Sequence, residues 1–158
     1  MRILVVSDTH GDVYSLQQAV AQQPKAEVII HLGDGAGEAA DLKLQYPEKA
    51  VLQVRGNWDW KSDLPVFGVQ TIEGKRFFFT HGHAYRAKSG MSDLIMAARE
   101  NHADILLFGH THRAVTDYED GLYIMNPGSL SGSGSGKQTY GVVDITKAGI
   151  VTNVMNLR

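Results

Sequence analysis

The stretch at residues 3–11, ILVVSDTHG, joins four consecutive apolar residues to a polar turn that ends in glycine. Short apolar runs of this kind are typical of strands that are buried on both faces of a parallel sheet. The same change from apolar to polar occurs four more times, at residues 28–35, 51–57, 77–83 and 105–112. We therefore predict five buried strands, each followed by a polar turn.

Helical periodicity lies between some of these strands. Strands that alternate with helices favour parallel pairing. Pro24 ends the first helix, and an Ala-rich stretch at about 38–45 predicts a short, weaker helix. The two clearer helices show apolar faces formed by Val13, Leu16, Ala19 and Val20, behind Asp12 as the expected N-cap, and by Met91, Leu94, Ile95 and Ala98.

The second half of the chain consists mostly of predicted strands. Residues 69–72 and 76–80 flank Glu73-Gly74-Lys75, which indicates a hairpin. Further strands are expected at 114–118, 122–125, 139–145 and 150–154, as antiparallel strands that join a second sheet. The sequence thus predicts an α/β fold in which two mixed β-sheets pack together between outer helices, a four-layer αββα sandwich that forms one domain over residues 1–158.

Composition narrows the function classes. The chain has 158 residues and no Cys, which excludes disulfides, thiolate nucleophiles and Cys-type zinc sites. Its 17 acidic residues against 15 Lys and Arg argue against duplex nucleic acid or a membrane surface as partners. The first apolar run is too short for a signal peptide, so we expect a cytoplasmic protein. A chain of this length folds without a metal, so any metal serves chemistry.

The polar turns carry seven oxygen or nitrogen donors. Ligands gather at the carboxyl ends of strands in open α/β sheets, so these turns are expected to surround one pocket. Each motif alone has an ordinary structural explanation as a turn or cap, but five strand ends are unlikely to supply metal-type side chains by accident. The donors are Asp8, His10, Asp34, Asn57, His81, His110 and His112.

Seven donors exceed the needs of one tetrahedral zinc ion. They indicate two divalent cations, about 3.5–4 Å apart, that share a bridging carboxylate. Ligands without thiolate suit Mn, Fe, Ni, Co or Zn, and manganese is the ion we favour. Such a site attracts an anion and lowers the pKa of water from 15.7 to about 7, which suits hydrolysis of a small phosphate ester. Arg55 is either a phosphate contact or a surface residue.

The ordered motifs Asp8-x-His10, Gly33-Asp34, Gly56-Asn57, His81-Gly82 and Gly109-His110-x-His112 resemble the calcineurin-like metallophosphoesterase superfamily. Asn126-Pro127-Gly128-Ser129 makes the chain most similar to the small single-domain phosphodiesterases of bacteria and archaea. The resemblance implies a four-layer αββα fold and a bridging hydroxide nucleophile, with no covalent phospho-enzyme. It places Asp8, His10 and His112 on one metal and Asn57, His81 and His110 on the other, with Asp34 as the bridge and with Asn57 and Arg55 on the phosphate.

Trp58 departs from the family pattern, because larger members carry a His directly after Gly-Asn that is thought to protonate the leaving oxygen. Either His83 takes that role, or the enzyme prefers leaving groups that need little help. The competing interpretation is that His83 is a hydrogen-bonded histidine behind the metal ligands or at the rim of the site. Trp58 and Trp60 either line the pocket mouth, where they stack on a base or aryl group, or belong to the core. His31, inside an apolar run, is expected to be a hydrogen-bonded structural residue.

The expected function is therefore a dinuclear phosphodiesterase. Two alternatives stay open: a phosphomonoesterase, and a noncatalytic interaction scaffold, since the family resembled includes a retromer subunit that keeps the fold. Homo-oligomerisation is compatible with the sequence but is not indicated by it.

Overall fold

The computed structural model describes residues 1–134 and 136–158. The helices are α1 (Val13–Gln22), α2 (Ala36–Gln45) and α3 (Ser92–Glu100), and two short 3-10 turns are η1 (His83–Tyr85) and η2 (Ala87–Ser89). The strands are β1 (Arg2–Val6), β2 (Ala26–His31), β3 (Ala50–Gln53), β4 (Phe67–Ile72), β5 (Lys75–Thr80), β6 (Ile105–Phe108), β7 (Val115–Glu119), β8 (Leu122–Asn126), β9 (Thr139–Thr146) and β10 (Gly149–Asn156).

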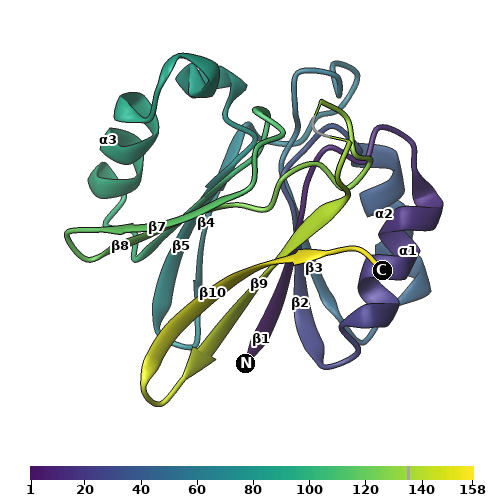
Figure 1. The fold of residues 1–158 in the computed structure, drawn as a ribbon, viewed down its shortest axis with the longest axis horizontal. Coiled ribbons are helices and arrows are strands. Elements are labelled where there is room, and N and C mark those ends of the chain that lie inside the picture. Colours follow the sequence, from purple (N-terminus) through teal and green to yellow (C-terminus); the bar gives the residue numbers. More distant parts are fainter. Residues whose placement is uncertain (135) are drawn as a thin grey trace.

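The described strands form two sheets that pack face to face. One has the order β10-β9-β1-β2-β3, and the other has the order β4-β5-β6-β8-β7. Helices α1 and α2 cover the outside of the first sheet, and α3 covers the outside of the second (Figure 1). This arrangement confirms the predicted α/β fold of four layers. Asp12 caps α1 as predicted, because its Oδ1 accepts a hydrogen bond of 3.0 Å from Ser15 N.

The buried apolar side chains form three layers, because side chains along each strand point alternately to the two faces of its sheet. In β1, Ile3 and Val5 face the second sheet, whereas Leu4 and Val6 face the helices. Side chains of successive residues point to opposite faces of a sheet, so a continuous apolar run supplies both layers. Each fully buried aliphatic or aromatic side chain contributes roughly 1.5–3 kcal/mol. The third layer, under α3, includes Phe78, Leu94, Ala98, Leu106 and Ile124.

The predicted placement of the C-terminal strands is wrong in two respects. β9 and β10 belong to the first sheet, where β9 pairs antiparallel with β1 and Leu4 lies opposite Val142. β8, moreover, pairs parallel with β6. The physical reason is burial: β9 is buried on both faces and needs a central position, whereas β7 is exposed at all five residues and suits an edge.

The two ends of the sandwich differ in their connections. The turns that follow β1, β2, β3, β5 and β6 lie at one end, because β1 to β3 are parallel to one another, as are β5 and β6 (Figure 1). The hairpin turns between β4 and β5, β7 and β8, and β9 and β10 lie at the opposite end. The predicted donors are all in the first set of turns.

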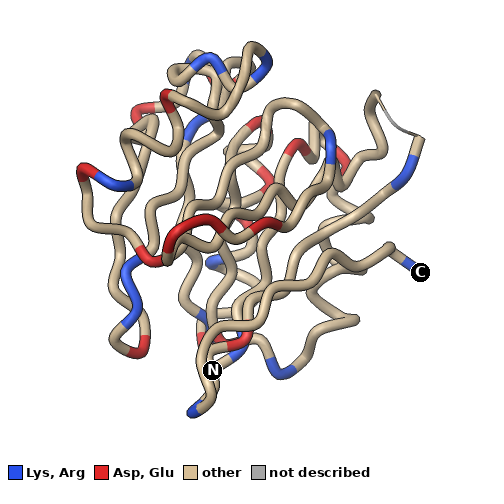
Figure 2. The backbone as a smooth tube through the Cα atoms, turned by 60° about the vertical axis from the view of Figure 1, so that its left-hand side comes forward, with Lys and Arg blue, Asp and Glu red and all other residues tan. Residues whose placement is uncertain are grey.

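Charge is spread over the molecule. Figure 2 shows Lys and Arg interspersed with Asp and Glu along the chain, in keeping with a net charge of −2. Among the described residues, no helix has the length and apolarity needed to cross a bilayer. The absence of duplex nucleic acid from the partners stays a prediction.

Candidate metal centre

Turns from both sheets bring most of the predicted donors together. Asp8 and His10 follow β1, Asp34 follows β2, His81 follows β5, and His110 and His112 follow β6. Two groups have all their donor atoms within 4.8 Å of one another: Asp8, His10 and His112 in the first, and Asp8, Asp34 and His81 in the second. Asp8 belongs to both groups, so they form one continuous cluster.

Distances within the cluster place Asp34 between two imidazoles. Its Oδ2 lies 3.3 Å from His81 Nε2 and 3.7 Å from His10 Nε2. His112 Nε2 is 3.0 Å from Asp8 Oδ1, and His110 Nδ1 is 3.2 Å from His81 Nε2. His110 and His112 thus lie beside different members of the cluster, although only one residue separates them in the chain.

The donor set fits a cation. The His81 ring is fully buried, and its Nδ1 lies 2.8 Å from Leu32 O. When Nδ1–H donates to that carbonyl, the lone pair of Nε2 faces the carboxylates of Asp8 and Asp34. This is the usual arrangement of a metal-binding His, whose second nitrogen is fixed by a backbone carbonyl. Without a cation or a proton between them, these carboxylates and the lone pair would face one another.

The pKa values of the donors show how strongly the cluster favours positive charge, which either a proton or a cation can supply. Burial lowers the pKa of His81, but the hydrogen bond to Asp34 and the charge of Asp8 outweigh it and raise the pKa above its usual value. Burial raises the pKa of Asp8, yet the neighbouring imidazoles of His10 and His112 hold it well below its usual range. Burial, with the charges of His81 and Lys88, lowers the pKa of His110 to about 4, so this imidazole is neutral near pH 7.

The backbone at the donors is strained. Left-handed φ angles are uncommon outside glycine and cost on the order of 1–3 kcal/mol each when the surroundings impose them. Such strain persists only where other contacts hold it, and it clusters at functional sites. Here it falls on five of the seven predicted donors, at Asp8 (57°), His10 (45°), Asp34 (59°), His110 (68°) and His112 (61°).

Three glycines allow the turns to approach one another. A Cβ at Gly56 would overlap Asp34 Oδ1 and lie 2.6 Å from Asp34 N. A Cβ at Gly33 would lie 2.6 Å from Gly56 N and 2.9 Å from His81 Nδ1, and one at Gly109 would overlap Ser7 Oγ. These three positions therefore need glycine because a larger residue would not fit between the turns, whatever backbone conformation each turn adopts.

Asp59, which the sequence analysis did not single out, organises two of the turns. Its carboxylate accepts hydrogen bonds from the backbone N–H groups of Asp34 (2.7 Å), Gly56 (2.8 Å), Gly35 and Ala36 (both 3.1 Å). It thus fixes the turn after β3 against the turn after β2 and satisfies the first N–H groups at α2. An Asp three residues after the glycine of a turn is a sequence signal that could have identified it.

Further polar residues support Asp8 and its neighbours. Ser7 Oγ donates to Asp8 Oδ2 at 2.6 Å, and Ser129 Oγ donates to Asp8 O at 3.1 Å. Asn126 Nδ2 donates to Gly109 O at 3.1 Å and to Thr111 Oγ1 at 3.0 Å. The segment Asn126 to Ser129 therefore holds the turns after β1 and β6 in place.

His31 is a structural residue, as predicted. Its ring is fully buried, Gly33 N donates to its Nδ1 at 3.1 Å, and its Nε2 lies 3.0 Å from Thr9 Oγ1. Thr9 in turn donates to Glu38 Oε2 at 2.7 Å. This chain of hydrogen bonds requires neutral His31 with its proton on Nε2, and burial lowers its pKa accordingly.

Two predicted phosphate contacts lie beside the cluster without side-chain hydrogen bonds to the described residues. Asn57 is exposed in the turn after β3, and Arg55 is half-buried at the start of that turn. Burial and the charge of His81 lower the pKa of His83, and the charge of Arg55 adds a smaller contribution of the same sign. Their roles stay predictions.

His83 is close to two of the predicted donors. Its ring centroid is 5.5 Å from that of His81 and 6.3 Å from that of His110. Its Nδ1 is buried and has no hydrogen-bond partner among the described residues. Burial, followed by the charge of His81, lowers its pKa. Trp58 and Trp60 are 68% and 70% exposed, so the alternative that they belong to the core is wrong.

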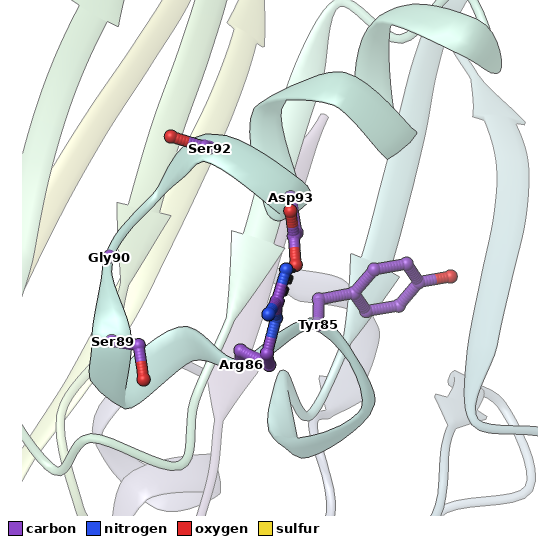
Figure 3. Close-up of a pocket in the computed structure, with 6 residues that line it drawn as sticks. All are labelled: Tyr85, Arg86, Ser89, Gly90, Ser92 and Asp93. Atoms are coloured by element: carbon purple, nitrogen blue, oxygen red, sulfur yellow. Dashed lines mark hydrogen bonds and ion pairs between the residues drawn. The ribbon is translucent and has the colours of Figure 1, made fainter.

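A cavity near η1 and α3 is separate from this cluster. It has a volume of about 250 Å³ and is lined by residues between Tyr85 and Asp93, none of which is a predicted donor. Figure 3 shows the Arg86 side chain directed at Asp93, and the two form an ion pair of 2.8 Å. The charges of Arg86 and Asp93 in this cavity therefore neutralise each other.

Comparisons with known proteins agree with the site. The profile of the calcineurin-like phosphoesterase superfamily domain matches residues 1–148. The probable metallophosphoesterase YsnB of Bacillus subtilis is 32% identical, over 82% of this chain and 75% of that protein. The phosphodiesterase MJ0936 of Methanocaldococcus jannaschii is 27% identical, over 93% and 95%. A predicted phosphoesterase of Streptococcus pneumoniae has a crystal structure similar to this one, with a TM-score of 0.81, 26% identity and coverage of 98% of this chain and 88% of the other. The chain therefore belongs to the calcineurin-like phosphoesterase superfamily, as the order of its motifs predicted.

Proposed function

We propose that this chain is a phosphodiesterase that depends on two divalent metal ions, manganese being the favoured one. The observation that carries the proposal is the continuous donor cluster in which Asp8 belongs to two groups and Asp34 lies between His10 and His81. Asp8, His10 and His112 would hold one ion, and His81, His110 and Asn57 the other, with Asp34 shared. Such ions, when bound, supply positive charge for the phosphoryl oxygens and lower the pKa of water.

Arg55 is the proposed phosphate contact. Its guanidinium makes no hydrogen bond to any described side chain or carbonyl, so its donors are available to a ligand, and its planar fork matches two oxygens of a phosphate group. Water is the proposed nucleophile, because two bound cations would lower its pKa, and membership of the calcineurin-like family implies a hydroxide nucleophile without a covalent phospho-enzyme.

His83 is the candidate proton donor to the leaving oxygen, because its ring lies beside those of His81 and His110. Its lowered pKa leaves only a small protonated fraction near pH 7, and only the protonated form can donate the proton. Trp58, at the position where larger relatives carry a His, cannot replace it. This combination favours esters whose leaving groups need little protonation. The name of the archaeal relative as a phosphodiesterase further supports a diester over a monoester.

Metal content and hydrolysis test the proposal together. We expect purified protein, loaded with manganese, to retain about two ions per chain by elemental analysis and to hydrolyse bis(4-nitrophenyl) phosphate faster than 4-nitrophenyl phosphate. Asp34→Ala is expected to lose metal and to lower the diester rate by at least about 1,000-fold, which corresponds to about 4 kcal/mol. Asp63→Ala, at an exposed residue between β3 and β4, is the matched control and should leave both unchanged.

Three outcomes would overturn the proposal or part of it. Equal rates for the wild type and Asp34→Ala would remove the site from the reaction. A faster monoester would indicate a phosphomonoesterase. Ion binding without hydrolysis of either ester would favour the noncatalytic scaffold.

A further inference from the structure

Trp58 and Trp60 form an exposed aromatic patch beside the candidate metal centre. They are the only two Trp in the sequence, and each exposes more than two thirds of its surface. An indole carries about 150–250 Å² of largely apolar surface, and proteins usually bury it. Two exposed indoles separated by one residue therefore indicate a binding surface for a ligand or another macromolecule.

The patch is fixed to the predicted metal ligands. Trp58 N donates to Asp34 Oδ1 at 2.9 Å. The Trp58 ring also lies edge-on to the His10 ring, with 6.5 Å between centroids and 78° between planes. Asp59, between the two indoles in sequence, is held by four backbone N–H groups. The backbone that carries both indoles is thus anchored to the turn that bears Asp34.

The indoles border a cavity with a volume of about 530 Å³, within the range of small-molecule sites. Small residues, Ala36 and Gly37, form part of its wall and leave room beside the rings. Lys61 Nζ lies 4.9 Å from the Trp60 ring centroid, in cation–π contact. The cavity therefore combines aromatic faces with the ammonium group of Lys61, and it is also lined by Asp59, whose carboxylate is held by four backbone N–H groups.

We propose that Trp58 and Trp60 bind a planar aromatic group, a nucleobase or an aryl ring, of the phosphate ester whose phosphate lies at the candidate metal centre. This inference rests on the proposed function. The Trp58 ring lies against the ring of His10, a predicted metal ligand. This contact favours a single ligand that reaches both the metal centre and the indoles over a separate protein partner. Stacking of a base on an aromatic side chain contributes about 1–3 kcal/mol and tolerates different bases.

Intrinsic fluorescence tests the proposal directly, since both Trp residues are in the patch. The probes are adenosine 5′-monophosphate and ribose 5-phosphate, which differ in the base, added to the manganese-loaded protein. We expect saturable quenching by the nucleotide alone. Calorimetry should show that Trp58→Leu and Trp60→Leu each weaken nucleotide binding by about 5- to 150-fold, while ribose 5-phosphate binding is unchanged. Phenyl phosphate, compared with methyl phosphate, separates aryl binding in general from base recognition.

Tyr118→Leu is the matched control, because Tyr118 is an exposed aromatic residue on the edge strand β7; it should bind both probes like the wild type. Equal affinity for the nucleotide and ribose 5-phosphate, or wild-type nucleotide binding by both Trp variants, would overturn the proposal. So would a dimer in gel filtration that dissociates on Trp58→Leu, because the patch would then bind a second copy. Base-dependent binding without ester hydrolysis would contradict the proposed function only, and hydrolysis without base-dependent binding would contradict this inference only.

Discussion

The two ends of the sandwich both contain residues other than glycine in the left-handed region, but for different reasons. At the hairpin end, Glu73 (φ 50°) precedes Gly74 (φ 76°), and Asp120 (φ 45°) precedes Gly121 (φ 83°). Two residues with positive φ are what a two-residue hairpin needs to match the twist of its strands. At the site end, five positive φ values fall on Asp and His residues that are predicted metal donors, and Arg86 (φ 53°), between η1 and η2, is a further residue of this kind that is not a donor.

The difference lies in what the conformation achieves. Glu73 and Asp120 are exposed, and their side chains are not needed for the turn. Asp8 and Asp34, in contrast, are buried, and their left-handed backbone turns the carboxylates towards His10 and His81. The hairpin end uses this conformation to reverse the chain, whereas the site end uses it to aim functional groups. Each of the following changes tests that distinction.

The largest effect is expected for Gly56→Ala. The new Cβ would overlap Asp34 Oδ1, so the turns after β2 and β3 must separate. We expect a loss of about 3 kcal/mol in the free energy of unfolding, typical of overpacking, together with loss of metal and of most activity. Gly37→Ala, in α2 with open space around the site of the Cβ, is the control for stability and metal content: its free energy of unfolding should be unchanged or higher, and metal should be retained. Equal behaviour of the two variants would show that the turns are not in tight contact.

Asp59→Asn should have the next largest effect. The amide keeps the shape but replaces an anionic acceptor of four N–H bonds, so some donors lose their partners. Urea unfolding should show a loss of about 2 kcal/mol. Activity should fall as well, because the strained turn at Asp34 loses its support. Asp63→Asn provides the comparison in the same connection, and if it costs as much, Asp59 has no special role.

Gly121→Ala is expected to affect stability alone. Alanine at a φ of 83° costs about 1–2 kcal/mol, and nothing lies within 4 Å of the added Cβ. The melting temperature should fall while the rate of ester hydrolysis at 25 °C is unchanged. A loss of activity without unfolding would mean that the two ends of the molecule are coupled.

The smallest effect concerns acid sensitivity at the site end. Burial lowers the pKa of His31. Below about pH 6.5 the unfolded chain therefore binds more protons than the folded chain, and the free energy of unfolding decreases as the pH is lowered. Relative to His31→Gln, the metal-free wild type should lose less than about 1 kcal/mol between pH 8 and pH 6. His10 and His81, with raised pKa values, contribute with the opposite sign in both proteins and cancel in the comparison. A pH-independent difference would indicate that His31 titrates normally.

The features that could be predicted best from the sequence are those that depend on the type of residue at a position. The strands at 3–6 and 105–108 and the donors that follow them could be predicted because apolar runs and metal-type side chains are visible in the sequence. The positions of β9 and β10 could not, because their hydrophobic pattern allows either sheet and only pairing with β1 decides. Asp59 escaped notice because its role depends on N–H groups of another turn, which come close only in the folded chain.

The support of Asp8 by a late segment has a consequence for biosynthesis. Leu130 N donates to Ser7 O, and Ser129 Oγ donates to Asp8 O, while β9 completes the sheet on the open side of β1. Translation therefore delivers every predicted donor, the last being His112, before it delivers the residues that fix the first of them. A ribosome-bound chain that ends at residue 112 contains all the predicted donors but lacks the contacts of Ser129 and Leu130 and the pairing of β9 with β1, so the geometry of the first donors is completed only after these residues have left the exit tunnel.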